Sequence, residues 1–361
     1  MSSDASAAAA SPMTNGTSLY GSHREADAST SPPSSHTLAD VCADLHNRVT
    51  KFLNAEPQNE TTKRTQQQTK VAMGVIEKAL HDYGFDALSL SYNGGKDCLV
   101  LLILYLAVLH TYFTQPTSRR KEASGNDNNN DNDNTKTFPP SIPSIYAKPP
   151  DPFPAVTSFV DSSSAQYHLS LTHISTNPGT KPTPSKAKSH SSPPTSPEKQ
   201  SIQAASHQDP NQISANEPHQ EGKIITFRDA FALYLDSHPS VRAIFVGTRR
   251  TDPHGAHLTH FDMTDGSWPS FMRIHPVIDW HLSEIWTFLR SPHLAGDVDR
   301  AAGRDHVEYC AMYDEGYTSL GGVGDTLRNP KLKHIDPETG EERFRPAYVL
   351  TEDDEERLGR E

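Results

Sequence analysis

The sequence contains few cysteines. Three occur among 361 residues, at Cys42, Cys98 and Cys310, and no two of them form a CxxC pair. An odd number of widely separated thiols predicts neither a disulfide framework nor a zinc site, and it favours a reducing compartment. The N-terminus has no basic leader and no arginine-rich stretch, so neither a signal peptide nor a transit peptide is expected. A cytoplasmic location is the resulting expectation.

Lysine and arginine are also sparse, and they are scattered along the chain. The 33 basic residues stand against 45 acidic ones, a formal net charge of −12. A nucleic-acid binder needs clustered cations to neutralise phosphates, so no nucleic-acid partner is expected. The long apolar run, Leu99–Phe113, falls short of the roughly twenty residues that span a bilayer. We therefore expect a buried helix there and no membrane partner.

Three stretches have too little apolar character to build a core. They are an Ala/Ser/Pro-rich start (1–37), an Asn/Asp-rich stretch (about 117–137) and a Pro/Ser/His-rich stretch (about 175–222). Ordering a backbone costs roughly 1–2 kcal/mol per residue, which such segments cannot offset by burial. We predict a disordered tail and two disordered insertions.

In the rest of the chain, segments with the hydrophobic periodicity of helices alternate with segments that have the pattern of strands. Helices are predicted at 38–53, 68–84, from 96, 153–167, 225–239 and 281–290, and strands at 87–92, 143–147, 168–174 and 241–248. Gly84 is a predicted C-cap. Such alternation predicts an α/β fold with a doubly wound, mostly parallel sheet and helices on both faces. Ligands bind at the carboxyl ends of such strands, where residues 91–97 and 247–253 fall.

The segment Ser91–Asp97, "SYNGGKD", joins a strand to a helix. Its glycines lack Cβ, so backbone N–H groups can approach an anion, and the helix start adds the positive end of its dipole. Lys96 can neutralise phosphate charge, while Asp97 can hold Mg²⁺ or a substrate hydroxyl. The spacing is neither GxxxxGK[ST] nor GxGxxG. On this loop alone, a plain turn between two elements remains a real alternative.

Further motifs follow in a fixed order. They are "FVGTRRTDPHG" (245–255), "DGSWPSFMRIHPVIDW" (265–280), "IWTFLR" (285–290), "YCAMYDEGYTSLGG" (309–322) and "PAYVLTEDDEERLGR" (346–360). The loop "SYNGGKDC" resembles that of the PP-loop pyrophosphatase superfamily. The ordered set resembles eukaryotic, particularly fungal, FAD synthases (FMN adenylyltransferases), relatives of phosphoadenylyl-sulfate reductases. Asn93 and Cys98 depart from the usual PP-loop residues but match this branch.

The resemblance covers the chain from Leu38 to the end, apart from the insertions. It implies a PP-loop catalytic domain over 38–290 and a flavin- and nucleotide-binding extension over 291–361. The implied reaction transfers AMP from ATP to the phosphate of FMN, with Mg²⁺, giving FAD and pyrophosphate.

The implied site residues fall into four groups. The catalytic residues are Asn93, Asp97, Asp252, Arg357 and Arg360. ATP and pyrophosphate would contact Ser91, Tyr92, Gly94, Gly95, Lys96, Arg249, Arg250 and Gly321. The flavin would contact Trp268, Arg273 and Arg357, and the metal Asp97 and Asp252.

Structural alternatives stay open for several of these residues. Asp252 could belong to a simple turn, Trp268 to the core, and the terminal arginines to a charged tail. Other functions also remain: another PP-loop adenylyltransferase, a reductase-like enzyme, or a binder without catalysis. Against a reductase, no ECGLH-like tail occurs, and Cys310 is expected to be a packed thiol. A monomer is the working expectation.

Overall fold

The structure is a computed structural model that describes residues 36–115, 137–176 and 225–360. Most of the predicted tail and of both predicted insertions lies outside these residues. Ordered structure reaches slightly into two of the expected segments. Thr37 is the N-cap of α1 (Leu38–Asn54), and Ser175 is the last residue of β3. The described residues form one compact unit, so the expected division at residue 290 stays a prediction.

Six strands of the described chain form one sheet, in the order β3–β2–β1–β4–β6–β5. All neighbouring pairs are parallel except β5 and β6, which are antiparallel. The strands are β1 (Leu88–Ser91), β2 (Ile142–Lys148), β3 (Leu169–Ser175), β4 (Ala243–Phe245), β5 (Phe261–Met263) and β6 (Met272–Ile274). The predicted strands are present. β5 and β6 were missed because each has 3 residues with a charged residue in the middle, whereas the equally short β4 stands in a longer apolar run.

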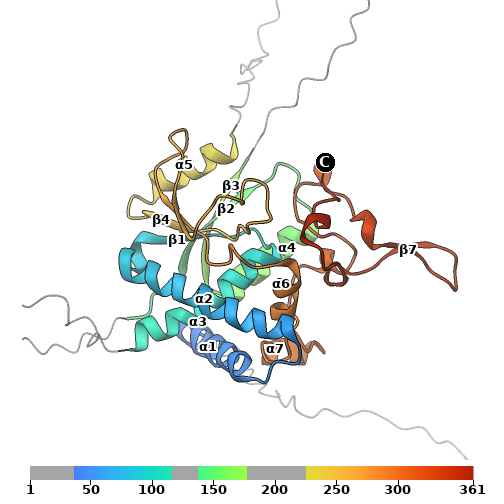
Figure 1. Cartoon of the computed structure of the whole chain (residues 1–361). Helices are drawn as coiled ribbons and strands as arrows, with labels where there is room; N and C mark the ends of the chain where they lie inside the picture. The colour runs from blue at the N-terminus through green and yellow to red at the C-terminus, as the bar shows by residue number, and fades with distance from the viewer. Residues whose placement is uncertain (1–35, 116–136, 177–224, 361) are drawn as a thin grey trace, which may run out of the picture. The chain divides into compact units, whose positions relative to one another are not determined.

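Helices cover both faces of this sheet, as predicted (Figure 1). The face that carries α3 packs against α1, α2, α4 and α6, and α5 covers the other face. The helices are α2 (Glu60–Tyr83), α3 (Lys96–Thr114), α4 (Pro154–Gln166), α5 (Phe227–Ser237), α6 (Leu282–Leu289) and α7 (Asp297–Ala301). Side chains alternate along β1: Leu88 and Leu90 join the α3 side, while Ser89 bonds to Tyr234 of α5 at 2.7 Å. The doubly wound α/β fold is confirmed.

The strand order reverses at β1. The chain runs outward from β1 to β2 and β3, then returns through α5 to place β4 on the other side of β1. Right-handed crossovers put the helices of the two halves on opposite faces, which opens a crevice where the order reverses. The carboxyl ends of β1 and β4 lie at this crevice.

Helix α2 begins earlier than the sequence pattern suggested. It starts at Glu60, where the Asn59 side chain accepts a hydrogen bond from the amide of Thr62. Its first turns are polar, so the apolar periodicity that identifies the rest of the helix begins only further along the sequence. It ends where predicted, at Gly84, which has φ +75° and caps the helix.

Helix α3 is the central element of the core. By length and composition it could cross a membrane, yet 67% of its apolar 18-residue window is buried within the fold. Every residue from Leu99 to Leu109 is buried, mainly against α1, α2 and α6. The apolar run is therefore a core helix, as predicted.

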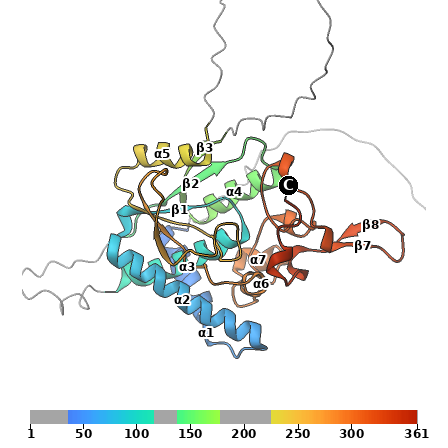
Figure 2. The same ribbon diagram turned by 45° about the horizontal axis from the view of Figure 1, so that its top comes forward.

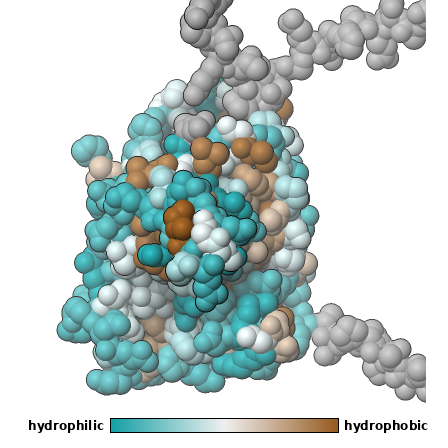
Figure 3. All heavy atoms as spheres, turned by 90° about the vertical axis from the view of Figure 1, so that its right-hand side faces the viewer, coloured by the Kyte–Doolittle hydropathy of each residue, from teal (hydrophilic) through white to brown (hydrophobic). Residues whose placement is uncertain are grey.

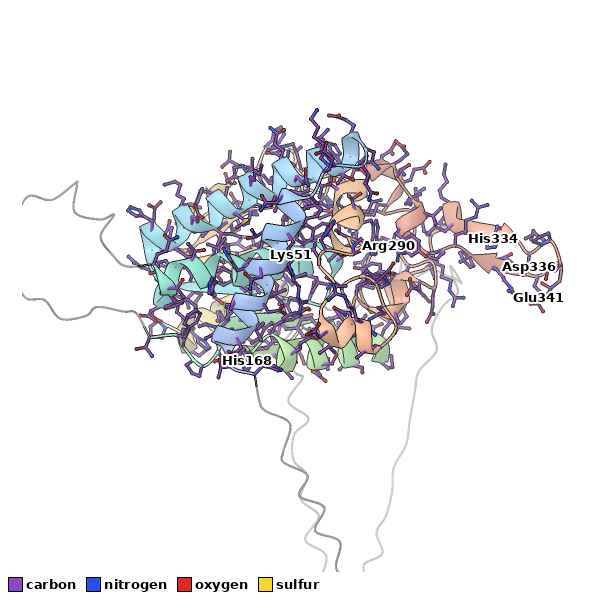
Figure 4. All side chains as sticks on the ribbon, turned by 90° about the horizontal axis from the view of Figure 1, so that it is seen from below. Lys51, His168, Arg290, His334, Asp336 and Glu341 are labelled. Atoms are coloured by element: carbon purple, nitrogen blue, oxygen red, sulfur yellow. The ribbon has the colours of Figure 1, made fainter. Side chains whose placement is uncertain are left out.

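The chain after α7 is built mainly from turns. A two-stranded hairpin, β7 (Lys333–Ile335) with β8 (Glu342–Phe344), projects away from the sheet (Figure 2). Its residues His334, Asp336 and Glu341 lie far from the helical layer, whereas Arg290 lies against it (Figure 4).

The 3₁₀ turns are η1 (Phe85–Ala87), η3 (Ala311–Tyr313), η4 (Val323–Asp325), η5 (Pro330–Leu332), η6 (Ala347–Val349) and η7 (Asp353–Glu355).

Candidate active site

The phosphate loop, defined here as Ser91–Asp97, connects β1 to α3. Gly94 has φ +73°, and a Cβ at this position would lie 2.8 Å from Val160 Cγ2 on α4. Glycine is therefore needed both for the backbone conformation and for the close approach of α4. Tyr92 is fully buried, and its hydroxyl bonds to Ser163 at 2.8 Å, so this predicted substrate contact is a core residue that fixes the loop.

Two amides of the loop already have partners. The amide of Gly95 donates to Asn93 Oδ1 at 2.9 Å, and that of Lys96 donates to Tyr313 Oη at 3.0 Å. Among the described residues, the amide of Gly94 has no hydrogen-bond partner, whereas the Asn93 backbone bonds to the Cys98 thiol. Gly94 is buried, so what this loop offers an anion is the positive end of the α3 dipole, next to the exposed Asn93.

The segment after β4 packs directly against the phosphate loop. A Cβ on Gly247 would lie 2.8 Å from Cys98 Sγ and 2.9 Å from the Cys98 amide nitrogen. The turn that follows is closed by the amide of Arg249, which donates to Asp252 Oδ2 at 2.8 Å. The two motifs predicted at the strand ends are thus adjacent in space.

Five charged side chains meet between these loops and the C-terminal segment. Lys96 Nζ lies 2.9 Å from Asp97 Oδ2, and Arg249 Nε lies 2.7 Å from Asp97 Oδ1. Both cations also bind the carboxylate of Glu356. Arg249 Nη1 reaches Asp353 Oδ1 at 3.0 Å. Glu356 and Asp353 were missed because they stand in an acidic run, "TEDDEER", that is typical of solvated surface.

The two predicted metal-binding carboxylates differ in their ionisation. Burial alone would raise the pKa of Asp97, but Arg249 and Lys96 hold it below its ordinary value. Burial, and then the negative charge of Asp97, raise the pKa of Asp252. The described residues contain no group of three or more metal-binding side chains. A pair of neighbouring carboxylates suits Mg²⁺ that keeps water and substrate phosphates as its other ligands.

Arg357 lies at the edge of this cluster, while the contacts of Arg360 lie outside it. Arg357 Nη1 lies 4.0 Å from Asp252 Oδ1, and its side chain is 41% exposed. Arg360 donates to Thr326 Oγ1 at 2.8 Å and packs on Gly321, where a Cβ would collide with its guanidinium. Gly321 is thus required to seat Arg360. Figure 3 shows that the side of the molecule carrying this segment is largely hydrophilic, with scattered apolar patches.

Three predicted site residues make contacts elsewhere. Arg250 donates to Asp279 Oδ1 at 2.7 Å. Arg273 donates to Met263 O on β5 at 3.1 Å, while its Nε is buried without a partner among the described residues. The Trp268 ring lies 6.0 Å from that of Phe231 on α5. No contact in the described chain joins these three to the phosphate loop, so their roles toward substrate stay predictions.

A cavity of about 450 Å³ adjoins the cluster at Asp353. Its wall comes from the first turns of α2 and α6 and from Thr351–Asp353, and it is lined by Glu60, Thr61, Arg64, His281, Ser283, Glu284, Thr351, Glu352 and Asp353. His281 Nδ1 lies 2.5 Å from Asp353 Oδ2, and the Leu282 amide donates to Asp353 Oδ1 at 2.7 Å. These contacts fix Asp353 between α6 and Arg249.

The cysteines of the described chain are free and poorly reactive. Burial raises the pKa of Cys98 to about 12, and burial also raises that of Cys310, which is fully inaccessible. A nucleophilic thiol needs a lowered pKa and access to its target. Cys310 is therefore a packed thiol, as predicted, and a thiol-dependent reductase mechanism finds no support here.

Comparison with known proteins places the chain in a family. The phosphoadenosine phosphosulfate reductase domain matches residues 87–328. A protein named "Probable FAD synthase" from Schizosaccharomyces pombe is 30% identical over 82% of this chain and 79% of its own length. The "Flavin adenine dinucleotide synthase" of Saccharomyces cerevisiae is 30% identical over 68% of this chain and 60% of its own length.

Solved structures share the fold. A crystal structure of Candida glabrata FMN adenylyltransferase with FMN and an ATP analogue superposes with a TM-score of 0.63, at 24% identity, over 90% of this chain and all of that one. The same enzyme with FAD and inorganic pyrophosphate gives 0.62 over 90% of this chain and 99% of that one, again at 24% identity. The chain therefore belongs to the phosphoadenosine phosphosulfate reductase domain family and, within it, to the FAD synthases.

Proposed function

We propose that this protein is a FAD synthase that transfers AMP from ATP to FMN, giving FAD and pyrophosphate. The observation that carries the proposal is the meeting of the phosphate loop, Asp252 and Arg357 where the strand order reverses. FAD synthase relatives that match most of the chain supply the identity of the reaction. The terminal phosphate of FMN attacks the α-phosphorus of ATP in line, the bond to the β-phosphate oxygen breaks, and pyrophosphate leaves.

The chemistry needs positioning and charge compensation more than it needs a base. A phosphate monoester has a second pKa of about 6, so the FMN phosphate is an anion near neutral pH. The protein must hold two polyanions together and stabilise the charge that spreads over the transferred group. The positive end of the α3 dipole, beside Asn93 and Gly94, would bind the leaving phosphates, and the exposed Arg357 would lower the repulsion between the substrates.

Asp252 would hold Mg²⁺ together with the phosphates of ATP, and Asp97, whose two oxygens bind Lys96 and Arg249 in this structure, would add negative charge beside it. The metal would supply positive charge to the departing pyrophosphate. The raised pKa of Asp252 fits this role, because a divalent cation relieves the repulsion between Asp252 and Asp97.

A direct assay tests the reaction. The full chain is incubated with ATP, Mg²⁺ and FMN, and FAD and pyrophosphate are quantified after chromatography. Riboflavin in place of FMN is the matched control, because it lacks the phosphate nucleophile. FAD and pyrophosphate in equal amounts with FMN, and none with riboflavin, is the expected result. Pyrophosphate release that requires an acceptor other than FMN would instead favour another PP-loop adenylyltransferase.

The pH dependence of Asp252 gives a second readout of the same proposal. Because its pKa is raised, Asp252 becomes an anion only above the ordinary carboxyl range, and activity that requires the anion must fall as pH is lowered through that raised pKa. Asp252→Asn should lower turnover by 10²-fold or more, roughly the effect of losing one electrostatic group, and should remove this acidic limb. Turnover within a few-fold of wild type would exclude Asp252 from the mechanism.

The compartment and the assembly state are further proposals. All three thiols are free, which suits the reducing compartment expected for a cytoplasmic enzyme. Cell fractionation and light scattering would test the cytoplasmic location and the monomer.

A further inference from the structure

Glu356 is a buried carboxylate that the substrate roles described above do not use. It is 4% exposed, and its two oxygens bind different cations: one binds Lys96 Nζ and the other Arg249 Nη2. A carboxylate this deeply buried is stable only when it is paired and hydrogen-bonded. The contact joins residues that are 260 and 107 positions apart in the sequence, so it ties the C-terminal segment to both loops of the site.

The cations bound by Glu356 are closed off from substrate. The side chains of Lys96 and Arg249 are 2% and 1% exposed, and each also binds Asp97. Arg249 is further held by Asp353 at 3.0 Å. Three carboxylates thus surround two cations in a buried cluster. Their charges are compensated within the protein, so in this arrangement they act on the C-terminal segment and leave phosphate to other donors.

The backbone of Glu356 is fixed from the opposite side. Thr318 Oγ1 donates to the Glu356 carbonyl at 2.5 Å, and Asn329 Nδ2 donates to the Glu355 carbonyl at 2.8 Å. Thr318 and Asn329 are themselves buried and bonded to each other at 3.0 Å. The main chain and the side chain of Glu356 are therefore both held, which leaves the next residue little freedom to move.

That next residue is Arg357, whose side chain is 41% exposed beside Asp252. We propose that Glu356 is a positioning residue: bound to Lys96 and Arg249, it sets Arg357 over the phosphate loop, where Arg357 meets the reacting phosphates. This inference rests on the proposed function. It divides the predicted phosphate-binding cations into two kinds, with Lys96 and Arg249 as an anchor and Arg357 as the group that faces substrate.

A double-mutant cycle tests this connection. Glu356→Gln keeps the size of the side chain and removes its charge, and Glu355→Gln is the matched control, because Glu355 pairs with the surface residue Lys331 at 2.5 Å. Glu356→Gln should lower kcat/KM for FMN by about 10²-fold, the cost of misplacing a catalytic group. Arg357→Ala should be costly in wild type yet nearly silent in the Glu356→Gln background. If the losses of kcat/KM in Glu356→Gln and Arg357→Ala multiply fully in the double variant, the proposal is overturned.

Hydrogen exchange of residues 346–360, followed by mass spectrometry, gives a readout that needs no activity. Glu356→Gln should speed exchange across this segment, and Glu355→Gln should not. If the wild type makes no FAD, the proposed function fails, while the exchange experiment still reports whether the anchor holds the segment. Exchange rates of this segment that are the same in Glu356→Gln and wild type would overturn the anchoring role of Glu356.

Pyrophosphate binding distinguishes two roles of Glu356: holding the C-terminal segment in place, or occupying a site that phosphate would otherwise fill. If Glu356 merely occupies a phosphate site, Glu356→Gln would bind pyrophosphate more tightly than wild type, and this would overturn the proposal. Glu356→Asp covers the case in which the Gln variant does not fold. It keeps the charge but is one methylene shorter, so it should retain the fold and the cluster yet still raise the KM for FMN. Wild-type kinetics in Glu356→Asp would contradict the positioning role.

Discussion

Helix α3 and the C-terminal segment 351–360 meet at the phosphate loop, but different forces hold them there. Every residue of α3 from Leu99 to Leu109 is buried, whereas Glu356 and Gly359 are the buried residues of the segment. Apolar burial of α3 does not depend on ionisation. The segment is held by ion pairs that exist only while its carboxylates are charged. Arg357 and Arg360, which are predicted to be catalytic, thus belong to a segment whose attachment depends on pH.

The largest effect on the free energy of unfolding is expected for a change in helix α3. Leu104→Ala removes a fully buried side chain from α3 and should lower the free energy of unfolding by about 2–5 kcal/mol. Leu358→Ala, in the segment, removes a side chain that is 49% exposed and should change it by no more than about 0.5 kcal/mol. Urea denaturation measures both. Equal losses would show that the segment is packed like the core.

A change at the contact between the two loops should have an intermediate effect. Gly247→Ala would push a methyl group into the backbone and thiol of Cys98, and overpacking of this kind costs about 1–3 kcal/mol. Gly74→Ala is the control, since a Cβ there meets nothing within 4 Å, and it should stabilise α2 by up to about 1 kcal/mol. FAD formation should fall only in Gly247→Ala. Activity that stays unchanged would show that the loops tolerate separation.

The smallest effect is expected from the charged contacts of the segment. Burial would raise the pKa of Asp353, but hydrogen bonds from His281 and the Leu282 amide hold it below its ordinary value. Because the folded-state pKa is the lower one, Asp353 stabilises the fold above the ordinary carboxyl range, and this contribution is lost as pH falls through the lowered pKa.

Asp353→Asn should therefore cost about 1 kcal/mol at neutral pH, typical of one polar contact, and progressively less in acid. Unfolding followed by circular dichroism across this range checks the difference. Asp354→Asn, at an exposed position, is the control and should follow the wild-type curve. A constant difference between Asp353→Asn and wild type at all pH values would contradict an ionic role for Asp353.

The elements that could be predicted from sequence are those whose signals are local. The apolar run after "SYNGGKDC" predicted α3, and Gly84 predicted the end of α2, because periodicity and glycine caps act within a few residues. The strands β5–β8 were missed because each has three residues and includes a charged one, whereas the equally short β4 stands in a longer apolar run. Trp268 shows the limit for aromatic residues: sequence alone could not choose between core and flavin, and the structure places the ring beside α5.

The sequence by itself determined the phosphate loop, the order of the motifs and the α/β alternation, since each depends on neighbouring residues and on backbone geometry. The tertiary structure alone decided which charges are buried and which stay exposed. Lys96 and Arg249 look like phosphate ligands in the sequence, and Glu356 looks like a solvated surface acid. Folding brings the three together in a buried cluster, where an unpaired charge is too costly to persist, so they bind one another and leave Arg357 exposed.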